Sequence, residues 1–150
     1  MYWTSSGLIK GLVMVGAFSA IFANSSSASE FEHLKQILER GDAEQFAIAH
    51  QCAALFHSSI ELGGNAMDEQ TLEKYKAMRS TAQKFSKISL EKKGLSGEDL
   101  ILAHVTGYLE KLTGYYTFYQ ELGKNGENPF ASSDWQADKE ICVKLFDLKP

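Results

Sequence analysis

A wide apolar face marks residues 42–62 as a central helix. The apolar side chains are Phe46, Ile48, Ala49, Cys52, Ala53, Leu55, Phe56, Ile60 and Leu62. At about 100° per residue these positions cover roughly half of the helix circumference. A helix that packs on one side has a stripe of only about 100°, so we predict neighbours on two sides. Asp42 is the predicted N-cap, with Gln45 completing a capping box, and Gly63-Gly64 is the predicted left-handed end.

Other segments also show helical periodicity between polar boundaries. A short amphipathic helix is predicted over 30–40, and Gly41 breaks it. A second long helix is predicted from a cap at Asn65 to Gly94, and a last helix opens at Ser133 with Gln136 in a capping box. The inner positions expected of the second long helix are Leu72, Tyr75, Met78, Ala82, Phe85 and Ser89.

The third long helix, predicted over 96–123, has the most regular spacing in the chain. Its apolar positions are Ile101, Val105, Tyr108, Leu112, Tyr115, Tyr119 and Leu122. The steps alternate between four and three residues, which is typical of the 3.5-residue seam of left-handed bundle packing. Gly107 and Gly114 lie inside this segment. They either weaken the helix or mark close packing.

These elements predict an all-α protein. Long alternation of the strand type is absent, and the 150 residues suit one domain. We predict four antiparallel helices in up-down-up-down order, with the short 30–40 helix docked on one end. The domain assigned to this bundle is 29–150.

The first 28 residues have a different composition. Lys10 is the only charged side chain before Glu30, and residues 11–23 are thirteen uncharged, mostly apolar residues followed by a serine-rich stretch. This pattern predicts a secretory signal peptide over 1–28, with cleavage after Ala23 or after Ala28. The expected location is therefore secreted or periplasmic. The alternative is an uncleaved membrane anchor, which needs about 20 apolar residues and thus an extension back through Lys10.

The charge balance and the missing motifs exclude several classes of function. A formal net charge of −4 argues against a nucleic-acid partner, because phosphate binding needs a basic surface. The sequence contains no Gly-x-Ser-x-Gly, no glycine-rich phosphate loop, no Cys-x-x-Cys and no Cys-x-x-Cys-His. We therefore predict no cofactor and identify no catalytic residue.

The two cysteines, Cys52 and Cys142, are predicted to form a disulfide. An exported protein with a single cysteine pair usually oxidises it. Each cysteine lies about 13–15 Å along its helix, and the first and last helices of an up-down bundle are antiparallel neighbours. The alternative is two free buried thiols.

The histidines do not predict a metal site. His50 and His57 are two helical turns apart, roughly 10.5 Å in height, which is too far to share one small ion. We interpret both as boundary residues with packed rings and solvated nitrogens. His104 lies one turn before Tyr108 on the third long helix.

An aromatic cluster on the third long helix supplies the candidate contact residues. His104, Tyr108, Tyr116 and Phe118 are the candidates for ligand or partner contact. The tyrosines at seam positions also suit a packed core. Tyr116 and Phe118 lie off the seam, so an exposed Phe118 beside Tyr116 is the predicted partner patch.

Three functional hypotheses follow. The first is a small exported protein that acts by binding an unknown protein partner, as an accessory protein, inhibitor or envelope factor, without catalysis. The second is a ligand carrier or enzyme whose inter-helix cavity is lined by tyrosine and histidine. The third is a membrane-tethered bundle, which applies only if the N-terminal segment is not cleaved.

Overall fold

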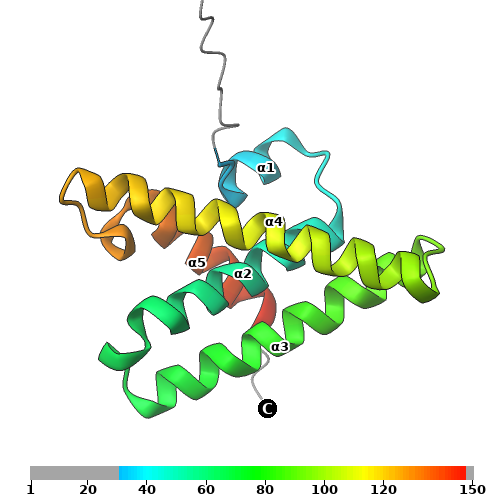
Figure 1. The fold of residues 1–150 in the computed structure, drawn as a ribbon, viewed down its shortest axis with the longest axis horizontal. Helices are drawn as coiled ribbons and strands as arrows, with labels where there is room; N and C mark the ends of the chain where they lie inside the picture. Colours follow the sequence, from blue (N-terminus) through cyan, green and yellow to red (C-terminus); the bar gives the residue numbers. More distant parts are fainter. Residues whose placement is uncertain (1–30, 148–150) are drawn as a thin grey trace, which may run out of the picture.

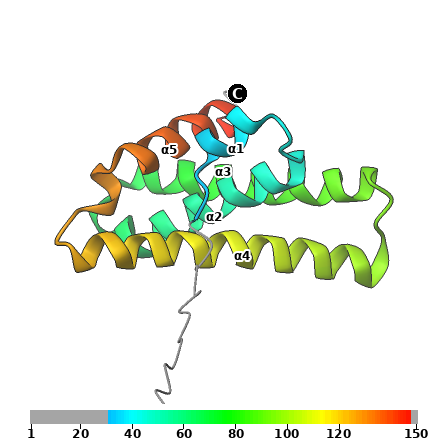
Figure 2. The same cartoon turned by 90° about the horizontal axis from the view of Figure 1, so that it is seen from above.

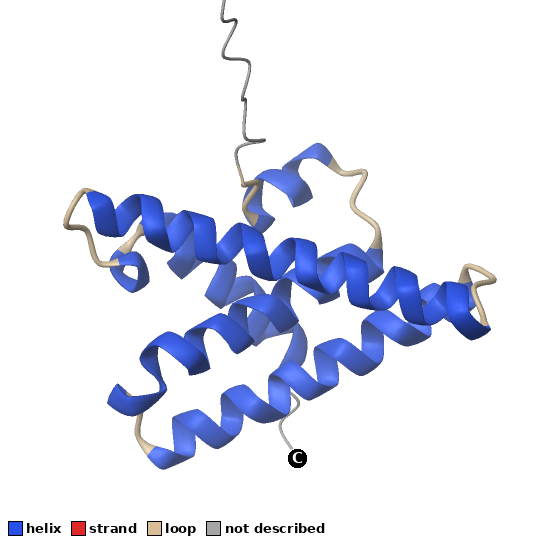
Figure 3. Cartoon of the chain, in the orientation of Figure 1, coloured by secondary structure: helices blue, strands red, loops and turns tan. Residues whose placement is uncertain are grey.

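The computed structural model describes residues 31–147, and every regular element within that range is helical (Figure 3). The all-α prediction is therefore confirmed for this part of the chain. The signal peptide predicted over 1–28 lies outside the described residues. The elements, in chain order, are α1 (Leu34–Arg40), α2 (Gln45–Gly63), the 3-10 turn η1 (Gly64–Ala66), α3 (Glu69–Lys92), α4 (Gly97–Lys124), the 3-10 turn η2 (Pro129–Ala131) and α5 (Ser133–Phe146).

The helices are stacked in three layers around α2. Figure 2 shows α4 on one side of α2 and α3, with α1 and α5 on the other. The helices α2, α3 and α4 alternate in direction along the chain, and the short α5 crosses behind α2 (Figure 1). α2 packs most extensively against α3 and next against α4. Its buried residues lie all round the helix, as the wide apolar face predicted, because it is covered on both sides.

Several predicted helix caps are wrong by one to three residues. α2 is capped by Glu44 and not by Asp42, whose carboxylate accepts a 2.6 Å hydrogen bond from Arg40. α3 is capped by Asp68, which accepts from the Thr71 N–H at 2.8 Å, because η1 occupies the region of Asn65. α5 is capped by Ser132, one residue before the predicted start. Gly64 also departs from expectation, since it is right-handed (φ −58°) and continues into η1.

The predicted seam of α4 is only half correct. Ile101 and Val105 were expected inside, but they are 61% and 45% exposed, whereas the neighbouring Leu100 is only 6% exposed. In the first half of α4 the positions that face the other helices are Leu100, His104 and Gly107, none of which belongs to the predicted seam. In the second half they are Tyr115 and Tyr119, as predicted. Ile101 and Tyr119 are 18 residues apart and therefore lie at the same angle on a straight helix, so the difference in their burial comes from what covers each end of α4 and not from the helical period.

The glycines inside α4 mark close packing, one of the two alternatives left by the sequence. A Cβ on Gly107 would lie 2.6 Å from Nδ1 of His50 on α2. A Cβ on Gly114 would overlap the Phe31 ring, which covers the centre of α4 just before α1. Both glycines therefore let other side chains approach the α4 backbone more closely than any L-residue would allow.

The predicted Cys52–Cys142 bridge is present, and it joins α2 to α5 with a Cα–Cα distance of 5.3 Å. Both cysteines are fully buried in the main core beside Ala49, Ala53 and Phe56. The bridge fixes the crossing point of α5 on the central helix.

Phe85, which was expected on the inner face of α3, is 41% exposed. Its ring packs edge-on against Phe146 of α5, with the centroids 6.0 Å apart. The short α5 therefore covers only one flank of the Phe85 ring and leaves the rest in solvent.

Candidate functional site

Two histidines from different helices meet where α2, α3 and α4 come together. His50 Nε2 lies 3.1 Å from His104 Nδ1, and Ser86 Oγ of α3 lies 3.2 Å from the same His104 nitrogen. Ser86 donates its own proton to the Gln83 carbonyl at 2.9 Å, so it accepts from His104. The His104 N–H therefore points between Ser86 and His50.

Both imidazoles are held in the neutral form. Burial, and next the neighbouring His104, lower the pKa of His50 from 6.5 to about 4. Burial, and then the charge of Lys87, also lower the pKa of His104. The candidate contact residue His104 is thus a structural partner of His50. This pairing was not predicted, because the two residues are 54 positions apart in the sequence.

A second polar chain crosses from α2 to α4, two helical turns further along α2 and one turn further along α4. His57 Nε2 donates to Glu61 Oε1 at 3.0 Å, which leaves Nδ1 to accept from the Tyr108 hydroxyl. The Tyr116 hydroxyl donates to the other oxygen of Glu61. The Tyr116 bond, and then the His57 bond, lower the pKa of Glu61, while burial chiefly raises the pKa of Tyr108 and of Tyr116. Two of the candidate contact residues, Tyr108 and Tyr116, therefore share one hydrogen-bonded cluster.

The fourth candidate, Phe118, packs within the molecule. Its ring meets His33 edge-on with the centroids 4.6 Å apart, and Phe31 lies 6.5 Å away. The lead-in to α1 therefore covers the part of α4 for which the sequence predicted an exposed aromatic patch. Phe118 is partly buried against the core, and as a residue two positions from Tyr116 it lies about 160° away round the helix.

A fully buried carboxylate, missed by the sequence analysis, ties three elements together. Asp138 on α5 accepts from the Leu34 N–H at 2.7 Å, from the Tyr115 hydroxyl at 2.7 Å and from His33 Nδ1 at 2.8 Å. Burial, and then the Asp138 charge, raise the pKa of Tyr115 well above its ordinary value, so the phenol remains a donor. One signal was available, since Asp138 lies between Trp135 and Cys142 on the inner face of α5 at helical spacing.

The hydroxyl of Tyr119, the other buried tyrosine on α4, is also hydrogen-bonded within the protein. Tyr119 donates to Ser58 Oγ at 2.9 Å, since Ser58 gives its proton to the Leu55 carbonyl, and accepts from Trp135 Nε1 at 3.2 Å. The buried tyrosines therefore bond to protein groups and not to a common void.

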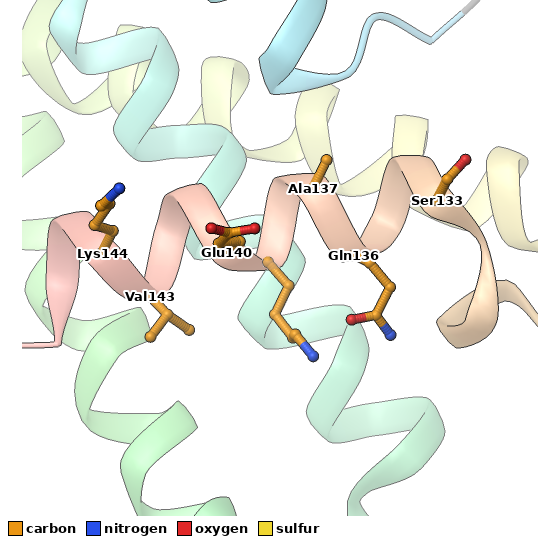
Figure 4. A pocket seen from close by; sticks show the side chains of 7 residues that line it. Ser133, Gln136, Ala137, Glu140, Val143 and Lys144 are labelled. Carbon is orange, nitrogen blue, oxygen red and sulfur yellow. The ribbon is translucent and has the colours of Figure 1, made fainter.

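The pocket shown in Figure 4 is a shallow, open depression of about 800 Å³ on one face of α5. Its lining comes from a single helix, and it contains neither a tyrosine nor a histidine. The lining residues are Ser133, Gln136, Ala137, Lys139, Glu140, Val143 and Lys144. This surface is separate from the candidate residues on α4.

Exposed apolar side chains gather on the first half of α4. Leu102 is 67% exposed and Leu109 is 50% exposed, and they lie beside the exposed Ile101 and Val105. No charged residue interrupts positions 100–109. Solvent exposure of this many large apolar side chains on one helix is typical of an interaction surface.

Two further findings concern residues 31–147 alone. None of their His, Cys, Asp and Glu side chains form a group of three or more that would hold a metal ion. None of their helices is both long enough and apolar enough to cross a membrane.

Comparisons with protein-family models, with curated proteins and with solved structures gave no match for this chain.

Proposed function

We propose that this chain is a small exported protein of four-helix-bundle topology that acts by binding a protein partner, as an accessory protein, inhibitor or envelope factor. The observation that carries the proposal is the apolar surface of α4, where Ile101, Leu102, Val105 and Leu109 are exposed. In a soluble protein such a surface usually has a partner. The engaged tyrosine hydroxyls of the core also favour binding at a surface over binding in a cavity.

Export to a secreted or periplasmic location is the second part of the proposal. The composition of residues 1–28 and the Cys52–Cys142 bridge both support it, because stable disulfides belong to oxidising compartments. Intact-mass measurement on protein purified from its host tests this part. We expect a chain that begins after Ala28 or Ala23 and carries one oxidised cysteine pair. A mass that retains residues 1–23 would favour the membrane-tethered alternative.

Site-specific photo-crosslinking in the host tests binding. A crosslinker placed at Leu109 should capture a distinct protein in the exported fraction. The matched control is Ile88 on α3, which is similarly exposed and lies on another helix. Equal capture at both positions, or none at Leu109, would contradict the proposal.

A ligand carrier or enzyme is the second candidate, and the Glu61–His57–Tyr108 chain is the observation in its favour. A carboxylate that orients a histidine, which in turn accepts from a hydroxyl, is the arrangement that activates nucleophiles. Native mass measurement tests this candidate. A bound small molecule that is lost in Tyr108→Phe and retained in Tyr75→Phe would support it over the first.

A further inference from the structure

The structure assigns the exposed face of α4 as a docking site for an amphipathic helix with basic residues at both ends. The docking face consists of Ile101, Leu102, Val105, Leu109, Leu112 and Tyr116. This inference rests on the proposed binding function and names the class of partner. At about 100° per residue these six side chains fall within about 100° of the circumference, which is the width of one helix-packing stripe.

The docking face is long enough for a helix of ordinary length. Ile101 to Tyr116 spans about 22 Å at 1.5 Å per residue. The first four members are exposed, while Leu112 and Tyr116 are half-buried at the end nearer the centre of the molecule. Anchors spaced at i, i+4, i+8, i+11 and i+15 are typical of a helix that receives the apolar side of another helix.

Carboxylates stand at both ends of the docking face. Glu98, in the first turn of α4, is exposed and lies one turn before Leu102 on the same side. At the other end, Glu61 of α2 accepts the Tyr116 hydroxyl and is about half exposed. Within residues 31–147 neither carboxylate forms a salt bridge with lysine or arginine. Arg79 on α3 also lowers the pKa of Glu61, but by less than the hydrogen bonds from Tyr116 and His57 do.

These charges discriminate among possible occupants. A second copy would place like charges together, either Glu98 against Glu61 in an antiparallel pair or each against its equivalent in a parallel pair. An anionic membrane surface would be repelled by the same carboxylates and by the formal net charge of −4. A helix with Lys or Arg in its first and last turns meets both carboxylates and covers the apolar surface between them.

Selection from a displayed helix library tests the inference. The bait is protein produced from the full 150-residue chain. Each library member carries a fixed leucine stripe, and its end positions are randomised among Lys, Gln and Glu. We expect Lys to be enriched at least about tenfold over Glu at both ends, which corresponds to about 1.4 kcal/mol per tenfold. The preference should weaken in high salt, because the screening length falls from ~30 Å at 0.01 M to ~3 Å at 1 M.

Matched variants locate the surface. Glu98→Gln should abolish the Lys preference at one end of the selected helix, and Glu61→Gln should abolish it at the other. Val105→Asp should weaken binding of the selected helix at least about tenfold, which is the effect expected from a charge buried against an apolar stripe. Ile88→Asp, a similarly exposed position on α3, should leave binding unchanged. Thermal melts of the two Asp variants check that both remain folded.

Three results of the selection would overturn the inference: equal enrichment of Lys and Glu, no selected helix, or binding that survives Val105→Asp. Two other results would assign the face to another occupant and overturn it as well: a concentration-dependent dimer that Val105→Asp abolishes, or binding to phosphatidylserine vesicles through the same face. The selection uses purified protein, so its failure is distinguishable from failure of export, which the intact mass reports separately. It is also distinguishable from a partner of other chemistry, which the Leu109 crosslink would still capture.

Discussion

At the scale of single residues, we expect the buried polar side chains to have the largest effects on stability. His50 is almost fully buried, and its nearest titratable neighbour is His104, with Lys111 and Glu110 acting from α4. Burial disfavours the imidazolium form, because the charge loses its hydration. The consequence is a dependence of stability on pH.

We expect the protein to lose stability as the pH falls from about 6.5 towards about 4, because the unfolded chain binds a proton that folded His50 does not. Below the pKa of His50 in both the folded and the unfolded chain, the loss of stability from this residue is complete. The difference between the two pKa values, 6.5 and about 4, corresponds to at most about 3–4 kcal/mol. Urea melts at several pH values measure it. His50→Gln should flatten the slope relative to the wild type, and identical slopes would show that His50 is not responsible.

Asp138 is the second residue whose removal should be severe. We expect Asp138→Ala to destabilise the fold by about 3–5 kcal/mol, because three buried donors lose their acceptor. Tyr115→Phe removes only one of these bonds and should lose about 1–3 kcal/mol. Hydrogen exchange should show loss of protection in α1 in the Asp138 variant, because Leu34 N–H is bonded directly to it. If α1 stays protected, its packing and not this carboxylate holds it in place.

At the scale of elements, the first half of α4 has two apolar faces, one packed inward and one exposed to solvent. Leu100 is buried and the adjacent Ile101 is 61% exposed, although both are large aliphatic residues on the same turn. This pair gives a direct test of the register.

We expect Leu100→Ala to destabilise the fold by about 2–4 kcal/mol through a cavity, and Ile101→Ala to change it by less than about 0.5 kcal/mol. Denaturant melts of the two variants provide the comparison. If Ile101→Ala lost much stability and Leu100→Ala lost little, Ile101 would lie in the core, as the four-three spacing predicted. The exposed docking face would then have no basis.

At the scale of the whole molecule, the disulfide joins the central helix to the last one across a sequence separation of 90 residues. Constraining so long a loop in the unfolded chain stabilises the fold by roughly 4–5 kcal/mol in the chain-entropy model. That value is comparable to the total stability of many domains, roughly 5–15 kcal/mol.

We expect Cys52→Ala and Cys142→Ala to lower the melting temperature by similar amounts, and the double variant to fall little further, because each removes the same bond. Alanine avoids burying a new hydroxyl at these fully buried positions. Additive losses in calorimetry would show instead that the two side chains act independently in the core.

The sequence by itself determined the helices of the described region and the pairing of the cysteines. Both depend on local pattern, because amphipathic periodicity, polar caps and a single cysteine pair can be recognised in the sequence without knowing which residues pack against them. The breadth of the apolar face on α2 was enough to predict its central place. The predicted helix caps are wrong by one to three residues: Asp42 bonds to Arg40 instead of capping α2, and η1 occupies the region of Asn65.

Only the tertiary structure decided which face of α4 is inside. Ile101 and Val105 are more apolar than His104 and Gly107, so the local pattern favours the wrong face. Gly107 lets the buried His50 ring approach the α4 backbone, and His104 gives that ring a hydrogen-bonding partner, so the more polar face packs inward. The same holds for the Asp138 cluster, whose donors lie 23 to 105 residues from Asp138 in the sequence and are brought to it by the crossing of α5. Burial of a polar group is favourable only when its partners arrive with it, and no local pattern records those partners.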